Sequence, residues 1–103
     1  MDVTDFQKLM RELYFHNDSK RGIYRTALWL VEEIGELVRE IKLNPEEIDK
    51  SKVEEEMADV YAWVASLANL LDIDLNKALI LKYPQFCPKC KKNPCICEKN
   101  LPY

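Results

Sequence analysis

Carboxylate side chains recur at helical spacing in two stretches of the chain. In "WLVEEIGELVREI", which begins at residue 29, Glu33 and Glu36 lie three positions apart. In "SKVEEEMADVYAWVASLANLL", which begins at residue 51, Glu56 and Asp59 repeat that spacing. Like charges one helical turn apart repel by roughly a few tenths of a kcal/mol per pair. Two such pairs on facing helices are better explained if a divalent cation lies between them.

The two stretches differ in how strongly their helix faces support this interpretation. At about 100° per residue, the acidic residues of the first stretch share one arc opposite an apolar arc, so on this helix alone a solvated face is the simplest explanation. These residues are Glu32, Glu33, Glu36 and Glu40. Glu56 instead projects into the apolar face of its own helix, with Asp59 at the edge of that face. Because burying an unpaired carboxylate is costly, Glu56 must lie at a wet cleft, be protonated, be paired or bind a cation.

The ligand type restricts which ion such a site prefers. Carboxylate oxygens favour Mg²⁺ or Mn²⁺. The chain has one histidine, His16, and no Glu-x-x-His motif, so the usual ligands of a di-iron bundle are missing. Since Mg²⁺ keeps several waters and shares its coordination with phosphates, the acidic cluster suits the binding of a nucleoside triphosphate.

A second group of potential metal ligands lies near the C-terminus. The segment "CPKCKKNPCIC" contains Cys87, Cys90, Cys95 and Cys97. The C-x-x-C and C-x-C pairs together offer four thiolates to a tetrahedral zinc site. Two disulfides and free or redox-active thiols are the alternatives. We predict a helical domain over residues 1–84 and a Cys-rich tail over residues 85–103. If the four cysteines bind zinc, this tail forms a zinc knuckle.

The elements that position these residues are predicted to be helices. Thr4 and Gln7 form a capping-box pattern for a first helix that runs to about His16, where "HNDSKRG" breaks it. A second helix is expected to begin near Ile23 or Tyr24 and to end before residue 44.

The remaining boundaries follow from caps and prolines. Asn44 before Pro45 predicts a short helical piece. Ser51 is expected to cap a third helix that reaches about residue 71, and Asp74 a fourth that Pro84 terminates. No stretch alternates like a strand, so we expect an all-α fold, an antiparallel helical bundle completed by dimerisation.

Composition excludes several classes of partner. The 103 residues carry a formal net charge of -3 with both signs interspersed, so a nucleic acid polymer is not an expected partner. The N-terminus lacks the pattern of a signal peptide, and no apolar run is long enough to span a membrane. We therefore expect a cytoplasmic protein that does not enter membranes.

The order of these blocks resembles the MazG-like nucleoside triphosphate pyrophosphohydrolase family. The resemblance rests on "EEIGE" at residues 32–36, "EMAD" at residues 56–59, and the flanking "DSKRG" and "KALILKYP", and it covers roughly residues 11 to 84. It implies an all-α fold that forms a homodimer or a dimer of dimers. It also implies hydrolysis between the α and β phosphates, which gives a nucleoside monophosphate and pyrophosphate.

The resemblance also implies roles for individual residues. Glu33, Glu36, Glu56 and Asp59 match Mg²⁺ ligands, and Glu32 matches a further ligand or the base that orients the attacking water. Lys82 matches a position near the phosphates. Candidate substrate contacts, each with a purely structural alternative, are Lys82, Asn69, Trp29 and Arg25.

Two rival functions remain open at this stage. The first is a non-enzymatic helical interaction module, with a solvated acidic face and a zinc-knuckle tail that binds a protein partner. The second is another carboxylate-metal bundle, such as an oxidase, which the missing histidines disfavour.

Overall fold

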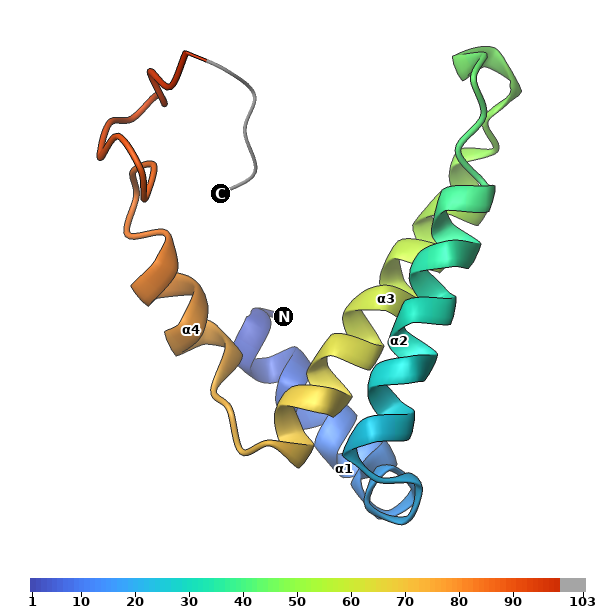
Figure 1. The fold of residues 1–103 in the computed structure, drawn as a ribbon. Coiled ribbons are helices and arrows are strands. Elements are labelled where there is room, and N and C mark those ends of the chain that lie inside the picture. The colour runs from blue at the N-terminus through green and yellow to red at the C-terminus, as the bar shows by residue number, and fades with distance from the viewer. Residues whose placement is uncertain (99–103) are drawn as a thin grey trace.

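The computed structural model describes residues 1–98, and residues 99–103 at the end of the predicted tail lie outside this part. The described residues form four α-helices and one short 3₁₀ helix, η1 (Figure 1). The elements are α1 (Val3–Arg21), α2 (Ile23–Arg39), η1 (Pro45–Glu47), α3 (Lys50–Leu70) and α4 (Leu75–Lys82). No strand occurs in residues 1–98, which confirms the predicted all-α class.

Helix α1 differs from its prediction at both ends. Asp2, and not Thr4, is the N-cap, because its carboxylate accepts the N–H of Asp5 at 2.8 Å in a capping box. The predicted end near His16 is also wrong, since the helix continues to Arg21. The polar segment contains no proline or glycine before Gly22, and basic residues in the last turn favour a helix C-terminus.

The other boundaries lie close to the predicted ones. Asn44 and Asp74 cap η1 and α4 as expected, and α2 begins at Ile23. For α3 the predicted cap is displaced. Asp49 accepts N–H bonds from Ser51 and Lys52 at 3.1 and 3.4 Å, so Ser51 lies inside the first turn.

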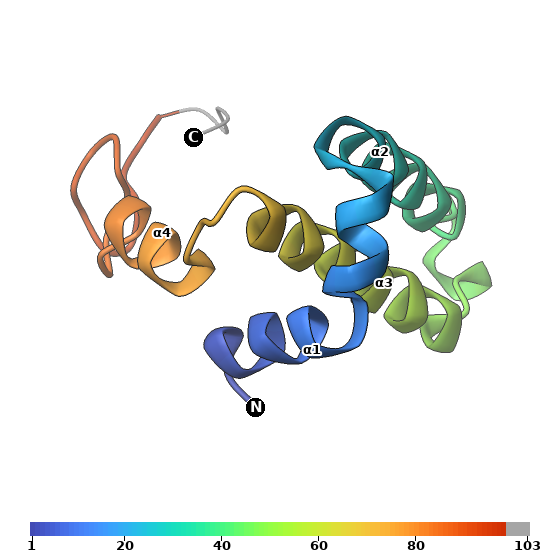
Figure 2. The same ribbon diagram turned by 90° about the horizontal axis from the view of Figure 1, so that it is seen from below.

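The helices pack as an antiparallel pair with two additions. Helices α2 and α3 run side by side in opposite directions, and α1 packs against both (Figure 1). Helix α4 packs against α1 and diverges from the α2–α3 pair, so that α4 and α2 lie on opposite sides of the molecule with α3 between them (Figure 2).

Small side chains allow the helices to approach closely. Thr26 of α2 and Ala65, Ser66 and Ala68 of α3 are buried, together with Met10 of α1. A polar clamp adds to this packing. The Gln7 amide donates to Asn69 Oδ1 at 3.0 Å and accepts the N–H of Leu75 at 3.0 Å, which ties α1 to the end of α3 and the start of α4.

Much apolar surface remains exposed in the single chain. The outer face of α2 carries Val31, Ile34 and Val38, each at least 44% exposed. Large apolar side chains of α4 are exposed as well. No helix in the described part of the chain is both long enough and apolar enough to span a membrane.

Candidate active site

Three of the predicted carboxylates converge between α2 and α3. Glu33 projects from α2, and Glu56 and Asp59 project from α3. Each of the three offers an oxygen atom that lies within 4.8 Å of the others. We call Glu33, Glu56 and Asp59 the carboxylate cluster.

Burial and like charge both raise pKa values in the carboxylate cluster. The pKa of Glu33 is raised above its ordinary value of 4.5 by desolvation first, then by the charges of Glu36 and Asp59 and a hydrogen bond with Glu36. The pKa of Glu56 is raised by desolvation, then by Glu36, Asp59 and Glu40. Burial and neighbouring negative charge thus both favour the protonated form of these two groups, and a cation in the cluster would oppose that effect.

Two oxygens of the cluster are buried without a partner. Oε2 of Glu33 and Oε2 of Glu56 accept no hydrogen bond within the described structure, although both are shielded from solvent. Orphaned buried acceptors are rare and costly, and a divalent cation satisfies them through ligand types that Mg²⁺ and Mn²⁺ prefer. The donor set therefore fits a hard divalent ion.

The other predicted acidic residues lie around this cluster. Glu36 is exposed one turn from Glu33 and is hydrogen-bonded to it, while Glu32 is exposed on α2. Glu40 is half-buried and close enough to affect Glu56.

The orientation of α2 corrects the helix-face interpretation. The sequence suggested glutamates on one side and an apolar arc on the other, with a solvated acidic face as the simple explanation. In the structure Glu33 and Glu40 are partly buried together with Leu30 and Leu37, whereas Val31 and its neighbours on the apolar arc face outward. In this orientation Glu33 of α2 meets Glu56 and Asp59 of α3.

A pocket adjoins the carboxylate cluster. Its volume is about 380 Å³, within the usual range for small-ligand pockets, and Asp59 belongs to both the pocket and the cluster. The wall includes residues of α1 and α3: Tyr14, Asn17, Arg21, Trp63 and Ser66.

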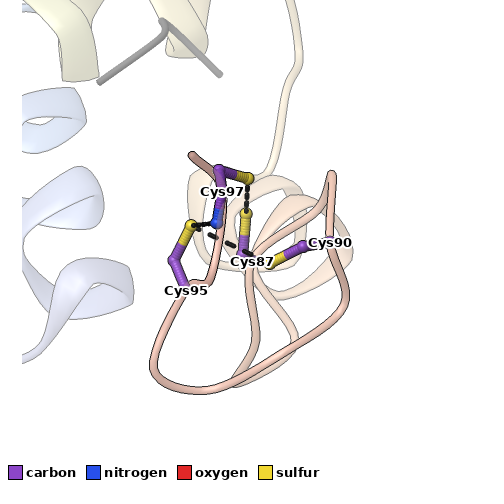
Figure 3. Close-up of side chains that lie close together, drawn as sticks. All are labelled: Cys87, Cys90, Cys95 and Cys97. Carbon is purple, nitrogen blue, oxygen red and sulfur yellow. Dashed lines mark hydrogen bonds between the residues drawn. The ribbon is translucent and has the colours of Figure 1, made fainter. Parts of the chain in front are cut away.

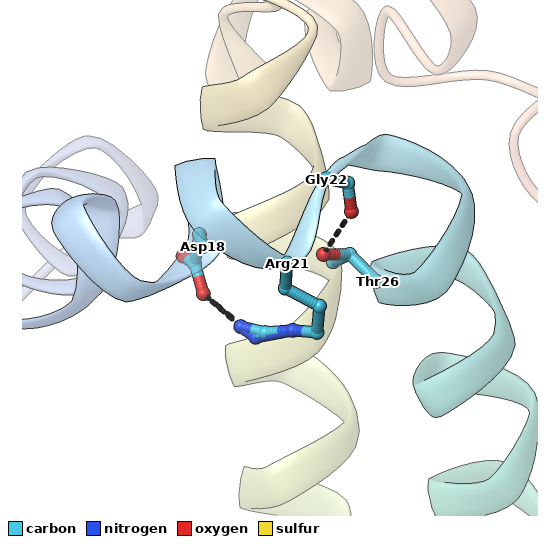
Figure 4. A network of polar contacts seen from close by, with 4 residues as sticks. All are labelled: Asp18, Arg21, Gly22 and Thr26. Carbon is cyan, nitrogen blue, oxygen red and sulfur yellow. Dashed lines mark hydrogen bonds and ion pairs between the residues drawn. The ribbon is translucent and has the colours of Figure 1, made fainter.

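The corner between α1 and α2 fixes one wall of this pocket. Asp18 is buried and forms an ion pair with Arg21 (Figure 4). The Thr26 hydroxyl donates to the carbonyl of Gly22 at 2.8 Å. The guanidinium of Arg21 lies 4.6 Å from the centre of the Trp63 ring. It also donates to the Asp18 carboxylate, which fixes its position over that ring.

The predicted substrate contacts have different surroundings. Trp29 stacks on Trp63, with ring centroids 6.1 Å apart and planes inclined by 20°, which places it next to the pocket wall. Arg25 is exposed on α2. Asn69 is buried and bonded to Gln7, and these bonds explain its burial without a ligand. Its contact with substrate stays a prediction.

Lys82 is not brought to the carboxylate cluster within one chain. It is exposed in the last turn of α4, which packs against α1 and diverges from the α2–α3 pair (Figure 1). Its contact with phosphate likewise stays a prediction.

Some residues of the site were missed by the sequence interpretation. Asn17 and Asp18 belong to the segment that was assigned to a helix break, and Ser66 was not singled out. The i, i+3 spacing of Asp18 and Arg21 was the sequence signal that could have indicated a longer helix, because a continuing helix brings these two side chains together as an ion pair.

Fold and site together define the class of this protein. It is an all-α protein with a candidate divalent-metal site built from carboxylates on two antiparallel helices. Residues 21–91 match the family model of the MazG nucleotide pyrophosphohydrolase domain. The match covers well over half of the 103 residues, so the chain belongs to this family. No curated protein matches the sequence.

Family membership confirms the resemblance seen in the sequence and indicates that the chain is a hydrolase that acts on nucleotides. The match includes Arg21 and continues past the predicted domain boundary at residue 84. It ends at residue 91, between the two cysteine pairs, whose four thiols also lie together.

Proposed function

We propose that this chain hydrolyses nucleoside triphosphates between the α and β phosphates, with Mg²⁺ as cofactor, to give a nucleoside monophosphate and pyrophosphate. The observation that carries the proposal is the carboxylate cluster with its two unpartnered buried oxygens, beside a pocket of about 380 Å³. Membership in the MazG family supports the same class of reaction.

The residues proposed to hold the metal are Glu33, Glu36, Glu56 and Asp59. Three of them form the carboxylate cluster, and Glu36 is hydrogen-bonded to Glu33 at its edge. When bound, Mg²⁺ supplies positive charge that offsets the charge of the phosphates. Mn²⁺ meets the same requirement for oxygen ligands.

The remaining roles belong to groups of the chain itself. Glu32 is exposed next to Glu33, where its carboxylate has room to orient a water molecule and accept its proton. Arg21, fixed by Asp18, places a guanidinium at the pocket wall and offers donors to a polar group of the substrate. Trp29, which stacks on Trp63 of the pocket wall, and the exposed Arg25 of α2 are proposed substrate contacts. Phosphoryl transfer depends mainly on such positioning and charge stabilisation.

The interaction-module alternative is less well supported. A solvated acidic face would leave its carboxylates in water, whereas Glu33 and Glu56 each bury an oxygen atom between two helices. We therefore retain only the enzymatic proposal for the α2–α3 site.

We also propose that the working form is a homodimer or a dimer of dimers. Apolar residues on α2 and α4 are exposed in the single chain, including Val38 and Leu81 at 62% and 75%. Such surface is typical of faces that a further copy of the chain covers. The divergent α4 would then bring Lys82 within reach of another subunit.

The decisive experiment compares two variants of α3 with the unmodified protein. Purified protein is incubated with each nucleoside triphosphate and Mg²⁺, and ³¹P NMR identifies the phosphorus products. Monophosphate with pyrophosphate indicates the proposed cleavage, whereas diphosphate with orthophosphate contradicts it. Glu56→Gln is expected to lower kcat/KM by at least about a hundredfold, because it removes a charge that holds the metal and the phosphates in place.

Glu54→Gln is the matched control. Glu54 is exposed on the same helix and does not contribute to the raised pKa values of the cluster. The control should keep the activity of the unmodified protein. Equal activity of both variants would refute the site assignment, and absence of hydrolysis with every triphosphate would refute the function.

A further inference from the structure

The four cysteines of the tail gather into one cluster. Sγ of Cys87 lies 3.9 Å from Sγ of Cys97, and Sγ of Cys90 lies 3.8 Å from Sγ of Cys95 (Figure 3). All four sulfur atoms lie within 4.8 Å of one another. Each of the two short distances joins a cysteine of the C-x-x-C pair to a cysteine of the C-x-C pair, so the two pairs interleave.

The spacing of the sulfurs fits a tetrahedral metal site. With zinc–sulfur bonds of about 2.3 Å, the edges of a regular tetrahedron of sulfurs are about 3.8 Å long. A disulfide requires its two sulfurs at about 2.0 Å, and the four cysteines are free. The geometry therefore favours a shared metal ion over two disulfides.

The backbone supports thiolates at this position. The N–H of Ile96 donates to Sγ of Cys90 at 3.4 Å, and the N–H of Cys97 donates to Sγ of Cys95 at 3.3 Å. The first loop is closed by the N–H of Lys91, which donates to the carbonyl of Cys87 at 2.8 Å. These bonds orient the sulfurs without a helix or a strand.

We propose that Cys87, Cys90, Cys95 and Cys97 bind one Zn²⁺ ion per chain in a closed, structural site. Four sulfur ligands leave no open position for substrate, so the site is not catalytic. Residues 83–98 contain no helix or strand, and only Cys87 among them is buried. A metal therefore replaces the apolar core that this segment is too short to form.

This site differs in chemistry from the carboxylate cluster. Thiolates select zinc or iron, whereas carboxylate oxygens select magnesium or manganese. The chain thus contains two sets of metal ligands that do not compete for the same ion. The proposal for the tail does not depend on the proposed hydrolase activity.

The test measures metal in the full-length protein. Protein purified without a metal-affinity step is expected to contain one zinc per chain by elemental analysis. After reduction and removal of the metal, titration with Co²⁺ should give the visible absorption of tetrahedral cobalt thiolate at one equivalent, and Zn²⁺ should abolish that absorption. Thiol titration in denaturant with a chelator should detect all four cysteines.

A Cys90→Ser variant should lose the stoichiometric zinc and the tetrahedral cobalt spectrum. Its helical circular dichroism is expected to persist, because α1 to α3 pack without the tail. Iron at one equivalent with a coloured protein would overturn the assignment of the metal. Fewer than four titratable thiols in freshly purified protein, or absence of cobalt binding by the reduced protein, would overturn the site.

Discussion

At the scale of single residues, Glu56 contributes oppositely to stability and to the proposed activity. Its carboxylate is partly buried among other acids, which raises its pKa above the ordinary 4.5. A carboxyl group whose pKa is raised by folding stabilises the fold fully below its unfolded-state pKa, and this contribution is lost as the pH rises through the folded-state pKa. The metal-free protein should therefore become less stable than a Glu56→Gln variant as the pH rises to neutral.

Urea unfolding in the presence of a chelator measures this difference. We expect the two proteins to have similar midpoints at acidic pH and the variant to have the higher midpoint at neutral pH. Excess Mg²⁺ should narrow the gap at neutral pH by stabilising only the unmodified protein. A Glu54→Gln control should follow the unmodified protein, and a pH-independent gap would contradict the electrostatic explanation.

At the scale of elements, the two glycines of the chain should respond oppositely to alanine. Gly22 joins α1 to α2 with φ 89° and ψ 166°, a backbone conformation that is nearly restricted to glycine. Gly22→Ala should cost about 1–3 kcal/mol of folding free energy. Gly35 lies inside α2, where an added Cβ meets no atom within 4 Å, so Gly35→Ala should stabilise by about 0.5–1 kcal/mol.

Denaturant unfolding of both variants distinguishes the backbone effect from the side-chain effect. The two substitutions add the same methyl group, and only the backbone conformation differs between them. Equal free-energy changes would show that the α1–α2 corner does not need its glycine.

Local signals predicted the elements well where one residue was clearly the better cap. Asn44 was predicted correctly because Pro45 marks the first turn of η1, and Asp74 was predicted correctly although Asp72 lies two residues before it. At the start of α3, Asp49 and Ser51 both have capping side chains, and the sequence pattern favoured the wrong one. The end of α1 was mispredicted because polar residues were interpreted as a break, although Gly22 is the first residue that interrupts the helix.

At the scale of the whole molecule, the single chain is more open than a compact domain of its size. Its accessible surface is 8318 Å², compared with about 6000 Å² expected for a compact monomer of 12.1 kDa. Its radius of gyration is 16.2 Å, compared with about 13 Å for a compact domain of this length. Both differences agree with the proposed association of chains.

A charge on the outer face of α2 should disrupt this association. Val38→Glu places a carboxylate on the exposed apolar face, where burial against another copy would be costly. Light scattering coupled to size-exclusion chromatography should show a lower mass for the variant than for the unmodified protein. Leu43→Glu is the control, since Leu43 lies in the loop after α2, and it should leave the mass unchanged. A monomeric unmodified protein would contradict the proposal.

The sequence predicted the members of the carboxylate cluster but not the surface around it. Spacing along α3 identified Glu56 and Asp59, because their place on the helix follows from the helical period alone. The rotation of α2 toward α3 depends on contacts between helices, which no local pattern contains. The pocket wall was missed for the same reason, since Asn17 and Ser66 come from helices distant in sequence.

The stacked indoles provide an optical reporter. The chain contains two tryptophans, Trp29 and Trp63, and both belong to the same stack, with Trp63 on the pocket wall. Tryptophan emission of the native protein, excited selectively over its five tyrosines, therefore originates at one location. A purine or pyrimidine that entered there would quench this emission, so ligand affinity can be titrated without attaching a dye.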